Sequence, residues 1–62
     1  MDFKIGEIIM VTEDRDGDDP VAQEYPNRHA TIKGFFPPYV EVEFLNGDIH
    51  RVLEKHIRKH LN

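Results

Sequence analysis

Hydrophobic and polar residues alternate most regularly between positions 39 and 52. Three apolar residues there alternate with two glutamates: Val40, Val42 and Phe44. A period of two places the apolar side chains on one face of a strand and the glutamates on the other. The dipeptide Asn46-Gly47 that follows is a strong hairpin signal. The segment therefore predicts two antiparallel strands joined by a tight turn.

A two-residue turn would also fix how these two strands pair. It places Phe44 opposite Ile49, and residues directly opposite each other share a face, so both are expected in the core. The same pairing puts Val52 on the outer face, where a valine is unexpected. A bulge near position 50 or 51 would return Val52 to the core, because a bulge shifts the alternation by one residue.

A first strand is predicted over residues 5–12, where β-branched and apolar residues dominate. Alternation turns one set toward the core: Ile5, Ile9 and Val11. The opposite set is Ile8 and Met10. Two apolar side chains together on an outer face indicate a surface for self-association, because exposed apolar patches usually mark interfaces. The alternative is that the following connection covers them through Val21 or Tyr25.

Residues 29–36 predict a second strand, with Ala30 and Ile32 turned inward and Gly34 permitting a sharp bend. Pro37-Pro38 interrupts the ladder, because neither residue can donate a backbone hydrogen bond. The chain then enters the alternating segment described above.

The last ten residues fit two structures. Leu53, Ile57 and Leu61 recur at the spacing of one helix face. We expect instead a single helical turn over Glu54–His56, followed by a closing strand over residues 57–60.

Composition predicts one small soluble domain. The chain has 62 residues and a net charge of −4, and it contains no cysteine, which excludes disulfides and thiolate metal sites. The longest wholly apolar run is Ile8–Val11, whereas a membrane span needs about 20 residues. No signal-peptide pattern is present at the N-terminus, so a cytoplasmic location without membrane contact is expected.

The order of these elements resembles the SH3-like small β-barrels, of the KOW, Tudor and photosystem I subunit IV type. The segments that carry the likeness are FKIGEIIMV, ATIKG, YVEVEFLNGD and RVLEKHI. The resemblance implies an all-β fold over residues 1–62: a five-stranded barrel with a long acidic first loop and a short helical turn before the last strand. Free-standing barrels of this size resemble bacterial or phage accessory proteins, and the superfold serves many unrelated functions.

The acidic stretch TEDRDGDDP lies in the long connection over residues 13–28, where Gly17 and two prolines make regular structure unlikely. A calcium-binding EF-hand loop aligned on Gly17 would have Thr12 at its first ligand position and Gln23 at its last, where a glutamate belongs. We therefore expect a solvated loop whose carboxylates meet a basic surface of a protein partner. In SH3 domains the corresponding loop lines the peptide groove.

Aromatic residues add a second kind of contact. Tudor-like barrels hold methylated lysine or arginine in aromatic cages, and Tyr25 and Tyr39 are suited to such a cage from adjacent loops. Phe36 and Phe44 are expected in the core instead. The residues predicted to contact a protein partner are Asp14, Asp16, Asp18, Asp19, Tyr25, Phe35 and Tyr39.

A nucleic-acid-binding function is the alternative. Residues 1–50 carry four basic and eleven acidic side chains, whereas residues 51–62 carry four basic side chains against Glu54, so −7 and +3 sum to −4. KOW-type domains contact phosphates, and the residues that would do so here are Arg51, Lys55, Arg58 and Lys59. An acidic chain is a poor general nucleic-acid binder, which makes this the second choice.

Catalysis and metal binding have little support. Serine and cysteine nucleophiles are absent, and no glycine-rich phosphate loop is present. The plasmid-borne type II dihydrofolate reductases are barrels of this size, but their Val-Gln-Ile-Tyr motif is replaced here by DIHRVL. His50, His56 and His60 lack an acidic fourth ligand for zinc. We therefore expect a non-enzymatic binding or regulatory module without cofactor or metal, capable of forming a homo-oligomer.

Overall fold

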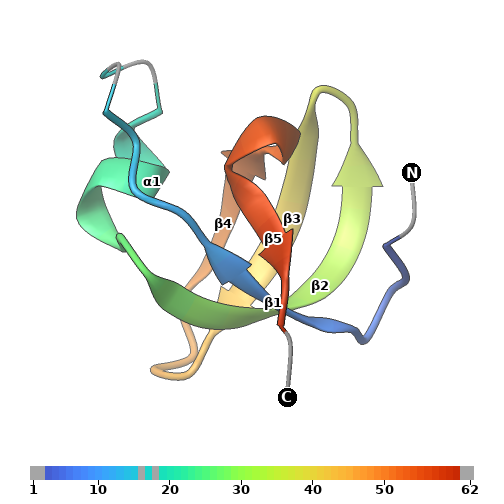
Figure 1. Cartoon of the computed structure of the whole chain (residues 1–62). Helices are drawn as coiled ribbons and strands as arrows, with labels where there is room; N and C mark the ends of the chain where they lie inside the picture. Colours follow the sequence, from blue (N-terminus) through green and yellow to red (C-terminus); the bar gives the residue numbers. More distant parts are fainter. Residues whose placement is uncertain (1–2, 16, 18, 61–62) are drawn as a thin grey trace.

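The computed structural model describes residues 3–15, 17 and 19–60, and its fold is mostly β (Figure 1). One antiparallel sheet has the strand order β4-β3-β2-β1-β5. The strands are β1 (Ile8–Val11), β2 (Arg28–Phe36), β3 (Tyr39–Phe44), β4 (Ile49–Leu53) and β5 (Ile57–Lys59). The all-β prediction with five strands is confirmed. Among the described residues no pairing joins β4 to β5, so the sheet is not closed into a barrel.

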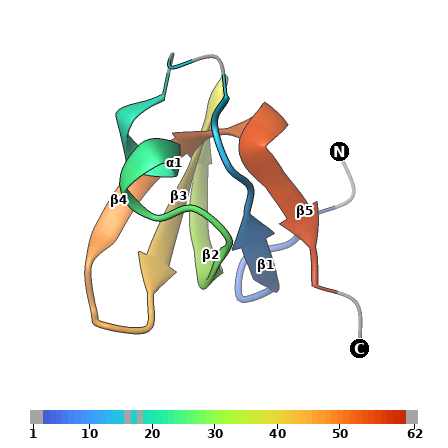
Figure 2. The ribbon, with the colours of Figure 1, turned by 60° about the vertical axis from the view of Figure 1, so that its left-hand side comes forward.

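The sheet is bent, so that β1 and β5 lie across from β3 and β4 (Figure 2). The core lies on its inner face, and its buried members are Ile9, Val11, Ala22, Ala30, Ile32, Val40, Val42, Phe44, Val52 and Ile57. Most of them follow the predicted alternation. Three predicted core residues lie outside it: Ile5, which precedes β1, is 66% exposed, Phe36 at the end of β2 is 43% exposed, and Ile49 on β4 is 55% exposed.

The β3–β4 hairpin differs by one residue from the predicted register. The backbone N–H of Gly47 donates to the carbonyl of Phe44 (2.9 Å), and the N–H of Phe44 donates to the carbonyl of Asp48 (2.8 Å). Gly47 has a φ of 91°, so it forms the bulge of a three-residue loop rather than part of a two-residue turn. Val52 therefore lies opposite Val40 in the core, and Ile49 is exposed. The predicted shift exists, but it occurs in the turn rather than near position 50 or 51.

The predicted bend in β2 is confirmed as a bulge. Ile32 lies opposite Val42, but Gly34 lies opposite Glu41, so Lys33 is the extra residue. A Cβ atom on Gly34 would lie 3.2 Å from the ring of Phe36, which is tight enough to favour glycine there.

The connection between β1 and β2 contains a short helix, α1 (Pro20–Glu24), where none was expected. Asp19 caps it: the side chain accepts from the N–H groups of Val21 (3.1 Å) and Ala22 (3.4 Å). Proline at the first helical position needs no hydrogen bond there. Ala22 then packs into the core.

The C-terminal prediction is confirmed. A single 3₁₀ turn, η1 (Glu54–His56), leads directly into β5 (Ile57–Lys59), which pairs with β1. Neither helical element in the described part of the chain is long and apolar enough to cross a membrane.

Candidate binding groove

The acidic stretch folds around a buried histidine. Asp14, Asp19 and His56, here called the His56 cluster, are 7%, 3% and 6% exposed. Asp19 Oδ2 lies 3.0 Å from His56 Nδ1, and Asp14 Oδ1 lies 3.5 Å from His56 Nε2. A carboxylate therefore faces each ring nitrogen of His56.

Backbone groups complete the His56 cluster. Asp14 accepts from the N–H of Gly17 (3.2 Å) and from the N–H of Asp19 (2.6 Å). Asp19 accepts from the N–H of Leu53 (2.8 Å) as well as capping α1. No buried side-chain nitrogen or oxygen among the described residues lacks a partner. The cluster thus fixes the connection against η1 and the end of β4.

This burial changes the expected role of the acidic residues. The expectation that Asp14 and Asp19 lie on a solvated loop is wrong, because both carboxylates are turned inward. Asp16 and Asp18 lie outside the described residues.

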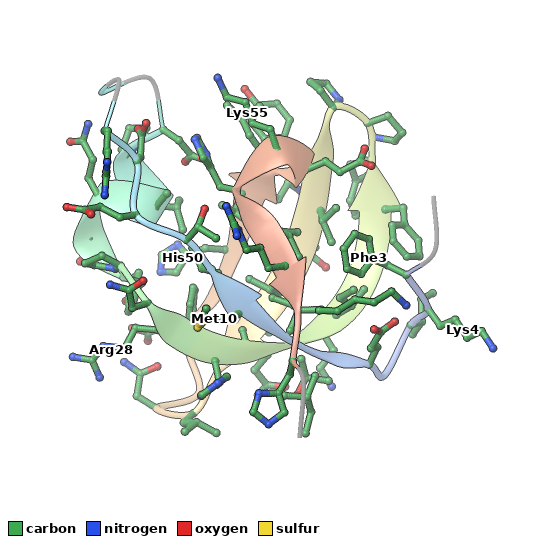
Figure 3. All side chains as sticks on the ribbon, viewed as in Figure 1. Phe3, Lys4, Met10, Arg28, His50 and Lys55 are labelled. Carbon is green, nitrogen blue, oxygen red and sulfur yellow. The ribbon has the colours of Figure 1, made fainter. Side chains whose placement is uncertain are left out.

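A groove of about 690 Å³ runs beside the His56 cluster. Residues from β1, the connection, η1 and β5 line it: Met10, Thr12, Glu13, Arg15, Asn27, Lys55, His56 and Arg58. Figure 3 shows Met10 near the middle of this side of the molecule, with Lys55 above it and Arg28 below and to the left. The groove therefore joins segments from both ends of the chain.

Two smaller hollows continue the groove. The first, of about 400 Å³, shares Met10 and Arg58 with it and adds His29, Lys59 and His60. The rings of His29 and His60 meet edge to face, with centroids 4.5 Å apart. The second, of about 610 Å³, shares Asn27 with the groove and extends to Tyr25 and Arg28. Each of the two hollows therefore adjoins the groove through shared lining residues.

Among the described residues that line the groove, basic side chains outnumber acidic ones, although the chain is acidic. Arg15 Nε lies 3.7 Å from Glu13 Oε2, with both side chains largely exposed. Lys59 Nζ lies 3.6 Å from Glu7 Oε2. In the described part of the chain, no ion pair involves Arg58 or Arg28.

The four basic residues of the nucleic-acid alternative do not form one patch. Lys55 and Arg58 line the groove, and Lys59 lines the adjoining hollow. Arg51 on β4 instead lies over the ring of Phe36, 3.8 Å from its centroid, and its Nε lies 3.5 Å from Glu41 Oε2.

The aromatic residues predicted to bind a partner are also separated. Tyr25 stacks on Phe44 at the C-terminal end of β3, with ring centroids 4.1 Å apart. Tyr39 lies at the N-terminal end of the same strand and is 43% exposed, so the two tyrosines do not form a cage. Phe35 is half-buried against the core.

The hydroxyl of Tyr25 donates to Asp48 Oδ2 (2.6 Å) and lies 3.4 Å from His50 Nε2. The hydrogen bond to Asp48 raises the pKa of Tyr25 above its ordinary value of 10.0. The hydrogen bond from Tyr25 in turn lowers the pKa of Asp48 below 3.8. This contact ties the end of the connection to the β3–β4 hairpin.

Ile8 and Met10 lie in different surroundings. Ile8 is 54% exposed, whereas Met10 is half-buried in the groove, with His29 and Arg58 opposite it on the neighbouring strands. The residues expected as a cover, Val21 and Tyr25, pack against the core instead. Self-association through Ile8 and Met10 stays a prediction.

Sequence reasoning missed three features of this site: the helix α1, the burial of His56, and Arg15 as a groove residue. Asp19-Pro20 is a common start signal for a helix and could have revealed α1. No local signal reveals the contact between Asp19 and His56, which are 37 positions apart.

The described residues contain no group of three or more histidines and acids placed to bind a metal ion. Comparison with protein-family models, with curated proteins and with solved structures found no match.

Proposed function

We propose that this chain is a small non-enzymatic module that binds a segment of a partner protein in the groove beside the His56 cluster. The observation that carries the proposal is the groove itself. Its lining includes a half-buried methionine, Met10, together with residues of the first connection, η1 and β5. Methionine adapts its shape to varied apolar side chains, which suits a binding surface.

The preorganisation of the groove supports this role. The connection that lines the groove is held in place because Asp14 and Asp19 accept hydrogen bonds from backbone N–H groups and because Asp19 contacts His56. A wall that is already ordered loses less conformational freedom on binding, which favours affinity.

We propose further that the fold is an SH3-like barrel. Support comes from the order of the strands: β1 to β4 form a meander, and β5 returns to pair with β1 after the 3₁₀ turn η1. In SH3 domains the first long loop lines the peptide groove, and here the first connection lines the groove through Glu13, Arg15 and Asn27.

The groove chemistry supports a binding role over a catalytic one. The hydroxyl of Thr12 donates to the backbone carbonyl of His56 (3.2 Å). The two ring nitrogens of His56 face the carboxylates of Asp14 and Asp19. These contacts engage the hydroxyl and the imidazole that a general-base mechanism would require.

Site-specific photo-crosslinking in the native cell tests the proposal. A photoreactive amino acid replaces Arg15, which lines the groove, and in a matched control replaces Ile49, which is exposed on β4 away from it. We expect a discrete crosslinked product from position 15 that resists nuclease, is degraded by protease, and disappears when Met10→Asp is added.

The control position gives the contradicting outcome. The same products from positions 15 and 49, or no product from position 15, would show that the groove is not the contact surface. The melting temperature of each variant is measured first, so that a loss of product is not caused by unfolding.

A further inference from the structure

We infer that the occupant of the groove is an acidic, extended segment of the partner, with carboxylates against Arg15, Lys55 and Arg58 and an apolar side chain on Met10. This inference rests on the proposed binding function and specifies its ligand. The inferred partner surface is acidic, whereas the acidic stretch in the sequence led to the expectation of a basic partner.

The local charge of the groove favours an anionic occupant. Among the described residues, the groove and the hollow that shares Met10 with it are lined by four basic side chains, Arg15, Lys55, Arg58 and Lys59, against one acidic side chain, Glu13. The chain as a whole has a net charge of −4. Charge complementarity at such a surface selects an anionic partner and speeds its association.

The cause of this reversal is the His56 cluster. Asp14 and Asp19 belong to the acidic stretch, but their carboxylates are buried against His56 and the backbone. Arg15, which lies between them in sequence, is left exposed, with a side chain that is 87% accessible. Its pairing with Glu13 is also exposed, and such pairs are weak competitors for a ligand carboxylate.

An extended occupant fits better than a compact anion. The cations come from three separate elements: Arg15 from the connection, Lys55 from η1 and Arg58 from β5. The positive lining then continues into the hollow that contains Lys59. Met10 belongs to both hollows, so an apolar side chain placed on it would lie between carboxylates on either side.

A protein segment fits better than a nucleic acid. Single-stranded nucleic acids bind through bases that stack on aromatic side chains, and the described residues that line the groove include no phenylalanine or tyrosine. Arg51, part of the predicted nucleic-acid set, is engaged with Phe36 and Glu41 on β4. The acidic charge of the remaining surface would also repel a long phosphate backbone.

Selection of displayed random peptides on the immobilised full chain tests the inference. Enriched peptides are then measured for affinity with three proteins: the wild type, the double variant Arg15→Glu with Arg58→Glu, and the control Arg51→Glu. Backbone amide shifts in NMR spectra locate each bound peptide. Arg51 is a suitable control because its side chain is also partly exposed but lies outside the groove.

We expect enriched peptides that are rich in aspartate and glutamate around an apolar residue. Their affinity should fall by about tenfold or more in the double variant and by less than about twofold in the control. If the double variant melts early, Arg58→Gln alone replaces it, with a smaller loss in the same direction.

Three outcomes would overturn the inference. Neutral or basic peptides bound in the groove would agree with the proposed binding function but would show that the ligand is not acidic. Peptides bound elsewhere, or none enriched, would remove both. Tighter binding of an oligothymidylate than of any peptide, with the same sensitivity to the double variant, would assign the groove to nucleic acid.

Discussion

Among the polar contacts that tie the connection between β1 and β2 to the rest of the molecule, those near its start and the one at its end differ in burial. At the start of the connection, Asp14 and Asp19 are buried against His56. At its end, Tyr25 donates to Asp48 in an exposed hydrogen bond of 2.6 Å. Both contacts are polar and both join segments that are far apart in sequence. They differ in their exposure to water.

The difference shows how burial sets the value of a polar contact. A buried group that loses its partner keeps the full cost of desolvation, because water cannot replace the partner. An exposed group that loses its partner is hydrated again. The His56 cluster should therefore determine whether the connection is ordered, whereas the Tyr25–Asp48 contact should only adjust it.

The largest expected effect comes from Asp19→Ala. This change removes the cap of α1, the acceptor for the Leu53 N–H and the carboxylate beside His56 Nδ1. Loss of a helix cap typically costs about 0.5–2 kcal/mol, and each buried donor left without an acceptor costs about 1–3 kcal/mol more. Urea denaturation measures the loss. A variant as stable as the wild type would show that the cluster is not buried in solution.

A smaller loss is expected from Asp14→Ala. The N–H of Asp19 would lose its buried acceptor, although Asp19 would still contact His56. An unsatisfied buried donor typically costs about 1–3 kcal/mol. The same urea experiment ranks the two variants by their free energy of unfolding. A larger loss of stability for Asp14→Ala than for Asp19→Ala would show that Asp14 is the more important carboxylate.

The smallest effect is expected from the exposed contact, and it depends on pH. The Tyr25 hydrogen bond lowers the pKa of Asp48 below 3.8, so its contribution to stability is present above that value and is lost as the pH falls through the lowered pKa. The pKa of Tyr25 is raised above 10.0, so the contribution is present below that value and is lost as the pH rises through the raised pKa.

Tyr25→Phe removes this hydrogen bond and tests that dependence. The stability difference between wild type and variant should be largest between these two limits and should shrink at both ends, as measured by thermal melts across pH. A difference that is constant with pH would show that the loss of the hydroxyl acts through packing on Phe44 alone.

The same contrast explains what the sequence could reveal. Strand alternation is a local signal, and it correctly placed residues such as Val40, Val42 and Ile9 in the core. The hairpin register was wrong because Asn46-Gly47 serves both a two-residue turn and a three-residue loop with a glycine bulge. Local sequence alone could not separate these two turns.

The candidate site was harder to predict, because its geometry depends on long-range contacts. Asp14 and Asp19 read as solvent-exposed acids until His56 is placed beside them by the pairing of β5 with β1. The groove then follows from that placement. Lys55 and Arg58 were identified as contact residues, but for a different partner and without Arg15.

A double-mutant cycle between Asp19 and His56 tests most directly the claim that the acidic stretch is folded around a buried histidine. The variants Asp19→Asn, His56→Gln and their combination are compared with the wild type by urea denaturation. Residues in direct contact should show a coupling free energy of at least about 1 kcal/mol. Losses that add to within about 0.3 kcal/mol would contradict the account, because independent residues behave that way.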